Sequence, residues 1–90
     1  MYFTKSSIYS DKVREILAQY GRLPVEVSSL SDDSDLYSAG LTSLATVGLM
    51  LAIEDTFDIE IPDTKLSRKT FETIEALRSV VEELLTTMPA

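Results

Sequence analysis

The chain contains no cysteine, no histidine and no tryptophan among its 90 residues. Without cysteine it can form neither a disulfide nor a thiolate that attacks a substrate or binds a metal. Without histidine it also lacks the commonest general base and metal ligand. We therefore expect no catalytic residue, no metal site and no enzymatic activity of its own. Thioester chemistry would require a thiol that another molecule supplies.

Long apolar runs are also missing. The longest run, around residues 49–53, ends at Glu54 and Asp55, so we expect no membrane span. The first five residues lack the basic-then-apolar order of a signal peptide, which favours a cytoplasmic location. A length of 90 residues, 44% hydrophobic and 26% charged, suits one globular domain, residues 1–90, and we expect a monomer.

Positive charge is absent from the middle of the chain. Residues 23–64 carry nine acidic residues and no basic one, so this segment is −9, the two flanks together are +2, and the net charge is −7. Nucleic acid is disfavoured as a partner, because its binding depends on Lys and Arg that neutralise phosphates. The acidic middle predicts partners with basic surfaces, although a solvated face that keeps the protein soluble explains it equally well.

Apolar residues at helical spacing predict a first helix from about residue 10, or from residue 6 or 7, to Tyr20, with Gly21 as its stop. The long connection 22–41 is expected to contain short structure. A second helix should begin at Thr42 or Ser43, either of which can cap it, and end near residue 57. Two stripes are predicted along this helix, one traced by Leu44, Val47 and Leu51 and continued by Glu54, the other by Met50, Ile53 and Phe57, and together they indicate a wide apolar face.

Two more helices complete the predicted fold. Ile59 and Ile61 alternate with acidic residues like a strand, but no partner strand is evident, so we expect a loop there. Asp63 can cap a short third helix that reaches about Lys69. Thr73 can cap a fourth helix, whose apolar residues repeat at helical spacing towards the end of the chain. The predicted fold is all-α, a four-helix bundle with a long first loop and a short third helix.

The sequence motifs around the second helix point to a known family. Residues 40–44 read Gly-Leu-Thr-Ser-Leu and place the Ser43 hydroxyl at the expected start of a helix, where unpaired N–H groups and the helix dipole favour an anion. A Glu-Asp-x-Phe helix end, an Ile-Glu-Ile-Pro-Asp turn at 59–63 and Thr-Ile-x-x-Leu at 73–77 follow. With these motifs, residues 25–85 resemble the acyl carrier and peptidyl carrier protein family.

The resemblance implies a chemical role for Ser43. It implies that a phosphopantetheinyl transferase attaches 4'-phosphopantetheine covalently to this serine. An adenylating acyl- or amino-acid:carrier ligase, or an acyltransferase, would then load the arm with a thioester for delivery to a downstream synthase or transferase. Residues on and around the second helix are expected to contact these partners, namely Leu44, Ala45, Gly48, Glu54, Asp55, Asp63 and Lys65.

The chain departs from the family pattern at two places. Thr42 stands where members most often have Asp, and a threonine can cap the helix but carries no charge. Ala45 and Gly48 stand where fatty-acid carriers commonly have acidic residues. We therefore expect a specialised cargo, such as an amino acid, rather than housekeeping fatty-acid synthesis.

The sequence suggests two other interpretations. The first is a small acidic helical adaptor that docks a basic protein partner and carries no covalent group. The second is a calcium site at Asp33, but an EF-hand loop beginning there requires Gly at the sixth position and Glu at the twelfth, where this chain has Ser38 and Leu44. A dedicated calcium site is therefore not expected.

Overall fold

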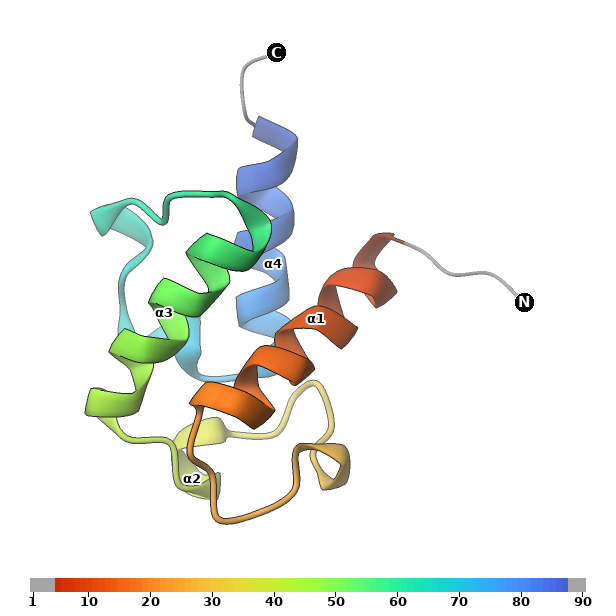
Figure 1. Ribbon diagram of the computed structural model, residues 1–90, viewed down its shortest axis with the longest axis vertical. Coiled ribbons are helices and arrows are strands. Elements are labelled where there is room, and N and C mark those ends of the chain that lie inside the picture. The colour runs from red at the N-terminus through yellow and green to blue at the C-terminus, as the bar shows by residue number, and fades with distance from the viewer. Residues whose placement is uncertain (1–4, 88–90) are drawn as a thin grey trace.

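Three long helices form the body of the molecule (Figure 1). In the computed structural model, which describes residues 5–87, they are α1 (Lys5–Tyr20), α3 (Ser43–Phe57) and α4 (Ile74–Thr87). Four short elements lie in the connections: the 3-10 turn η1 (Val27–Ser29), the one-turn helix α2 (Leu36–Ala39) and the 3-10 turns η2 (Asp63–Lys65) and η3 (Arg68–Phe71). No strand occurs in this described part.

The predicted all-α fold is confirmed, with two differences in its short elements. The expected third helix from Asp63 to Lys69 consists of two 3-10 turns, which suits a segment too short to propagate a regular α-helix. The long first loop holds α2, a helix that the sequence did not predict. In Figure 1 this loop and α2 lie at the same end of the molecule as the start of α3.

Each long helix buries one stripe of side chains in a shared core. Residues three, four, seven or eight positions apart lie on one face of a helix, and the buried residues follow this spacing. α1 contacts both α3 and α4. The buried stripes are Val13, Ile16 and Leu17 on α1, Ala45, Leu49 and Ile53 on α3, and Ile74, Leu77 and Val81 on α4.

The buried face of α3 agrees with one of the two predicted stripes. Ile53 of that stripe is buried, and Met50 and Phe57 pack against the core. Leu44, Val47 and Leu51 of the other stripe are 85%, 52% and 56% exposed, so that stripe faces solvent. This helix is apolar around most of its circumference, and periodicity alone cannot decide which side faces the core. The packing of α3 against α1 makes that choice.

Both ends of α3 are fixed by specific contacts. Thr42 is its N-cap, and the Thr42 Oγ1 atom accepts a 3.1 Å hydrogen bond from the Ala45 N–H. The helix ends at Asp58, whose backbone is left-handed with φ of 53°. Beyond it the chain forms a loop, as expected, and Ile61 is buried there while its N–H donates to Glu54 Oε2 at 2.8 Å.

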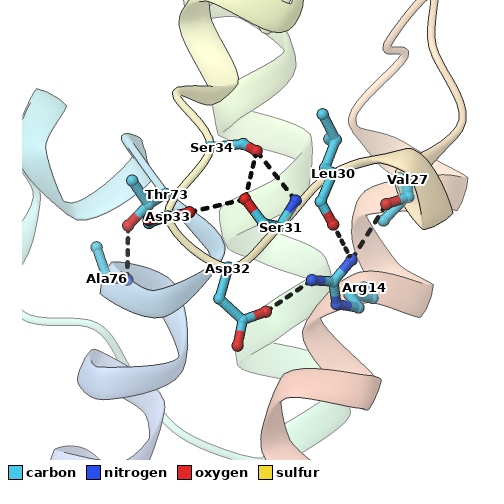
Figure 2. Close-up of polar contacts among 9 residues, drawn as sticks. All are labelled: Arg14, Val27, Leu30, Ser31, Asp32, Asp33, Ser34, Thr73 and Ala76. Atoms are coloured by element: carbon cyan, nitrogen blue, oxygen red, sulfur yellow. Dashed lines mark hydrogen bonds and ion pairs between the residues drawn. The ribbon is translucent and has the colours of Figure 1, made fainter.

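Arg14 on α1 holds the long first loop in place (Figure 2). Its Nη1 atom donates to the carbonyl oxygens of Val27 and Leu30 at 3.1 and 2.9 Å, and its Nη2 atom lies 2.7 Å from Asp32 Oδ1. The Asp32 carbonyl in turn accepts from the Glu75 N–H of α4 at 2.9 Å. One guanidinium therefore ties the loop to α1, and the Asp32 carbonyl ties it to α4.

Replacing Arg14 with alanine is expected to lower the free energy of unfolding by about 2 kcal/mol, since hydrogen bonds to charged groups contribute about 1.5–3 kcal/mol. Urea denaturation of the purified protein measures this loss. The matched control is Lys12→Ala on the same helix, whose pair with Glu15 is exposed and is expected to contribute less than about 0.5 kcal/mol. Equal stability of the two variants would show that the loop does not depend on Arg14.

Candidate functional site

Ser43 is the first residue of α3, and its side chain is exposed. Within residues 5–87 its hydroxyl forms no hydrogen bond, since Thr42 provides the cap and Thr46 Oγ1 donates to the Ser43 carbonyl oxygen at 2.5 Å. The first N–H groups of a helix have no intrahelical acceptor and carry the positive end of its dipole. Ser43 therefore presents a free hydroxyl where a negatively charged substituent is stabilised.

A groove of about 420 Å³ runs beside Ser43, between α3 and the segment that contains η2 and η3. Its apolar lining comes mainly from Met50, Val47, Leu66 and the buried Phe71. Its polar lining comes from Ser43, Thr46, Ser67, Tyr37 and Arg68. An apolar surface with a few polar groups fits a linear arm that has both methyl and amide groups.

The helix α2 places Tyr37 in this groove. Asp35 caps α2, and its Oδ1 atom accepts hydrogen bonds from the Tyr37 and Ser38 N–H groups at 3.0 and 3.3 Å. The Ser38 hydroxyl also donates to this carboxylate, and these hydrogen bonds keep the pKa of Asp35 below its usual value. Burial raises the pKa of the Tyr37 hydroxyl, while the positive charge of Arg68 acts in the opposite direction.

A second groove, of about 440 Å³, lies where the end of α1 meets the start of α3. It is lined by Gln19, Tyr20, Arg22, Leu44, Ala45 and Gly48. Val47 belongs to the first groove and Leu44 to the second, and with Leu51 they form an exposed apolar strip that we call the α3 ridge. Gly48 has no side chain to add bulk beside the ridge, and the space there is open, since a Cβ atom built on it would meet nothing within 4 Å.

The residues expected to contact partners differ in their exposure. Leu44, Gly48 and Asp55 are exposed on α3. Ala45 is 8% exposed and packs in the core, and it reaches the surface only in the lining of the second groove. Glu54 also has a structural role, since it accepts from the Ile61 N–H.

The last two expected contact residues lie on η2, away from the start of α3. Asp63 is exposed. Lys65 forms an ion pair with Glu83 of α4, with Nζ 2.9 Å from Oε2. The ion pair of Lys65 links η2 to α4, and neither Asp63 nor Lys65 lines the groove beside Ser43.

Sequence reasoning missed several residues at this site. The groove residues Tyr37 and Arg68 come from short elements far apart in the sequence, and no local pattern links them. Val47 and Leu51 were expected in the core. Their exposure follows only from the orientation of α3, so the α3 ridge was not foreseen.

The acidic middle of the chain provides no metal site in the described residues 5–87, where no group of three or more His, Cys, Asp or Glu side chains is arranged to hold an ion. The loop carboxylates have local partners instead. Asp32 pairs with Arg14, Asp33 accepts from the Ser31 hydroxyl at 2.7 Å, and Asp35 caps α2. None of the helices in that part is long and apolar enough to cross a membrane.

A family model described as the phosphopantetheine attachment site matches residues 11–84, which include Ser43 and both grooves. The chain belongs to this family. Membership makes 4'-phosphopantetheine its prosthetic group and makes it a carrier protein. The site fits such a group, because a free helix-terminal hydroxyl is an acceptor for a phosphate-linked arm and the adjoining groove has room for a linear chain.

Relatives of the chain are also carrier proteins. An aminoacyl carrier protein of Agrobacterium fabrum is 52% identical over 73 residues, which cover 81% of this chain and 88% of that protein. The crystal structure of an engineered Bradyrhizobium japonicum glycine:[carrier protein] ligase, complexed with carrier protein from Agrobacterium tumefaciens and AMP, contains a chain with 51% identity and a TM-score of 0.79. That match covers 81% of this chain and 97% of the other.

A third relative is the holo acyl carrier protein NE2163 of Nitrosomonas europaea, which has a solution NMR structure. Its sequence is 32% identical to this chain. Its TM-score is 0.78, and the match covers 87% of this chain and 96% of that one. The similarity in fold therefore extends over most of the chain.

Proposed function

We propose that this chain is an aminoacyl carrier whose 4'-phosphopantetheine is attached to Ser43 Oγ. One observation carries the assignment: Ser43 is an exposed hydroxyl without a hydrogen-bond partner among residues 5–87, at the first position of a 15-residue helix and inside the matched family segment. The neighbouring Thr42 hydroxyl is already engaged as the cap, which disfavours it as the acceptor.

The residues around Ser43 act by position and charge. A phosphopantetheinyl transferase from outside the chain performs the transfer, and Ser43 is the acceptor and not a catalyst. The backbone N–H groups of the first turn of α3 stabilise the phosphodiester. When attached, the arm supplies the thiol that the chain lacks and holds the cargo as a thioester. The chain itself performs no catalysis, in agreement with its lack of cysteine and histidine.

An amino acid is the cargo that the observations favour. The relatives include an aminoacyl carrier protein and a carrier protein in complex with a glycine:[carrier protein] ligase. The exposed surface of α3 next to Ser43 is apolar and not acidic, since it consists of the α3 ridge and Gly48. We therefore propose that an adenylating amino-acid:carrier ligase charges this single-domain, cytoplasmic monomer, and that a downstream transferase or synthase receives the cargo.

The cargo is tested by offering the phosphopantetheinylated protein to two kinds of enzyme. We expect amino-acid:carrier ligases with ATP and a labelled amino acid to attach label that hydroxylamine releases, as a thioester requires. We expect fatty-acid synthesis enzymes to elongate chains on it poorly. Elongation at the rate of a housekeeping carrier, with no amino-acid charging, would refute the aminoacyl assignment.

The alternative of an unmodified adaptor is supported by the acidic middle, since Asp32 is the one carboxylate of residues 23–64 that forms an ion pair within the described part. Intact mass spectrometry of the protein from its native host separates the two functions. A carrier shows the added mass of the arm, whereas an adaptor shows the mass of its sequence alone.

A further inference from the structure

Arg68 at the start of η3 rests on an aromatic ring beside the proposed attachment site. Its guanidinium carbon lies 3.9 Å from the centroid of the Tyr37 ring, and both residues line the groove that contains Ser43. A guanidinium stacked on an aromatic face is held in place by the ring while the N–H groups at its edge stay available. The stack therefore fixes a cation in the wall of the groove.

The edge of this guanidinium has no partner within residues 5–87, where Arg68 forms neither a hydrogen bond nor an ion pair. The other arginines with a fixed side chain are different. Arg14 donates to two carbonyl groups and a carboxylate, and Arg78 lies 2.7 Å from Glu82. Arg68 thus has a defined position but no structural acceptor for its five N–H donors.

Two acidic side chains lie near enough to interact electrostatically with the Tyr37–Arg68 stack. Arg68 helps to lower the pKa of Asp35, and Glu72 acts on Tyr37. The Asp35 carboxylate already accepts from the Tyr37 N–H, the Ser38 N–H and the Ser38 hydroxyl. Its hydrogen bonds serve the cap of α2, so it does not take up the free edge of Arg68.

We propose that Arg68 binds the phosphodiester of the arm on Ser43 and thereby directs the arm into the groove lined by Met50, Leu66 and Phe71. The phosphodiester is the one anionic group of 4'-phosphopantetheine, and it is bonded directly to the serine oxygen. The planar fork of an arginine matches two phosphate oxygens. The inference rests on the proposed attachment at Ser43, and it makes Arg68 a positioning residue.

A competing explanation is that any positive charge near α3 attracts the phosphodiester. Arg22 in the second groove provides the control for this explanation. Arg22 lines that groove together with Leu44 and Gly48, on the opposite side of the α3 ridge from Arg68. It too forms no ion pair with a described residue. If net positive charge near α3 were all that mattered, the two arginines would act alike. Binding by Arg68 predicts that they do not.

The test uses ³¹P NMR on the phosphopantetheinylated protein, which contains a single phosphorus atom. The variants are Arg68→Gln, Arg68→Lys and the control Arg22→Gln, each first shown by intact mass to carry the arm and by the melting of its apo form to be folded. The urea-unfolded protein gives the reference shift of a phosphodiester without protein contacts. The wild-type resonance is expected to differ from this reference and to be broader.

In Arg68→Gln the ³¹P resonance is expected to move most of the way to the shift of the unfolded protein and to sharpen. In Arg68→Lys the shift is expected to lie between those of the wild type and Arg68→Gln. Arg22→Gln should keep the wild-type resonance. An unchanged resonance in Arg68→Gln, or equal shifts in Arg68→Gln and Arg22→Gln, would overturn the proposal. Slower charging by a ligase with an unchanged resonance would also overturn it, because Arg68 would then serve the partner. Failure of the wild type to accept the arm would instead refute attachment at Ser43.

Discussion

Replacement of Ser43 by alanine is expected to abolish phosphopantetheine addition completely. The variant removes the only atom that accepts the phosphate, and the neighbouring Thr42 hydroxyl is held by its 3.1 Å bond to the Ala45 N–H. Intact mass spectrometry after coexpression with a permissive phosphopantetheinyl transferase measures the result. Wild-type protein should gain the mass of one arm, and Ser43→Ala should keep the mass of its sequence.

The structure also predicts that Ser43→Ala remains as stable as the wild type, because Ser43 does not cap α3. The matched control is Thr42→Val, which removes the neighbouring hydroxyl and keeps the shape of the side chain. It should still accept the arm but lose about 1 kcal/mol of stability with its cap. Persistence of the added mass in Ser43→Ala, or its mapping to Thr42 by peptide analysis, would show that the site is assigned to the wrong hydroxyl.

The sequence located the long helices because their signals are local. Thr73 caps α4 as predicted, with a 3.0 Å hydrogen bond from the Ala76 N–H to its hydroxyl. Gly21 follows the last residue of α1, as predicted, because glycine is a natural stop at the end of a helix. The start of α3 was confined to two residues because a hydroxyl there can satisfy a free N–H group of the first turn.

The groove beside Ser43 could not be predicted from local sequence patterns. Its wall is formed by α2, η3 and the side of α3, which the chain brings together from separate segments. The placement of α2 depends on contacts of the long loop with α1 and with the end of η3, such as those of Arg14 and the 2.8 Å hydrogen bond from the Leu36 N–H to the Glu72 carbonyl. No spacing within the sequence encodes such pairings.

Neither groove beside Ser43 is lined by an acidic residue of the described chain, although the surrounding stretch of sequence is acidic. The nine carboxylates lie in one stretch of sequence, yet the structure surrounds Ser43 with the apolar α3 ridge and places Arg22 and Arg68 in the two flanking grooves. A partner that approaches Ser43 along this helix therefore meets apolar side chains first. Long-range attraction between the acidic segment and a basic partner would speed their association, and contacts with the α3 ridge would provide most of the binding energy.

Substitution of Gly48 by glutamate is expected to separate stability from function at this surface. Glycine in an exposed helix interior costs about 0.8–1.0 kcal/mol relative to alanine, and glutamate is nearly as favourable as alanine. Because the added side chain meets no atom of the protein, Gly48→Glu should raise the melting temperature. Charging by the cognate ligase should nevertheless fall by about tenfold or more, since a side chain and a charge would intrude where we propose that the partner lies close.

Three further variants show whether bulk, charge or the loss of an apolar contact lowers charging by the ligase. Gly48→Ala gives the same gain in helix propensity with the least bulk and should charge almost normally. Gly48→Gln adds the bulk without the charge, so the difference between it and Gly48→Glu measures the electrostatic part. Leu44→Gln, at a side chain 85% exposed, tests the ridge itself and should lower kcat/KM by about 30-fold if Leu44 is a binding hot spot worth about 2 kcal/mol.

The control for an exposed apolar residue elsewhere is Ile8→Gln. Ile8 is 49% exposed near the start of α1, and Figure 1 shows that end of α1 far from the start of α3. It should charge like the wild type, because a partner seated on the α3 ridge does not reach it. Normal charging of both Gly48→Glu and Leu44→Gln would mean that the ligase binds another face, and the unusual glycine would then reflect drift at an exposed position.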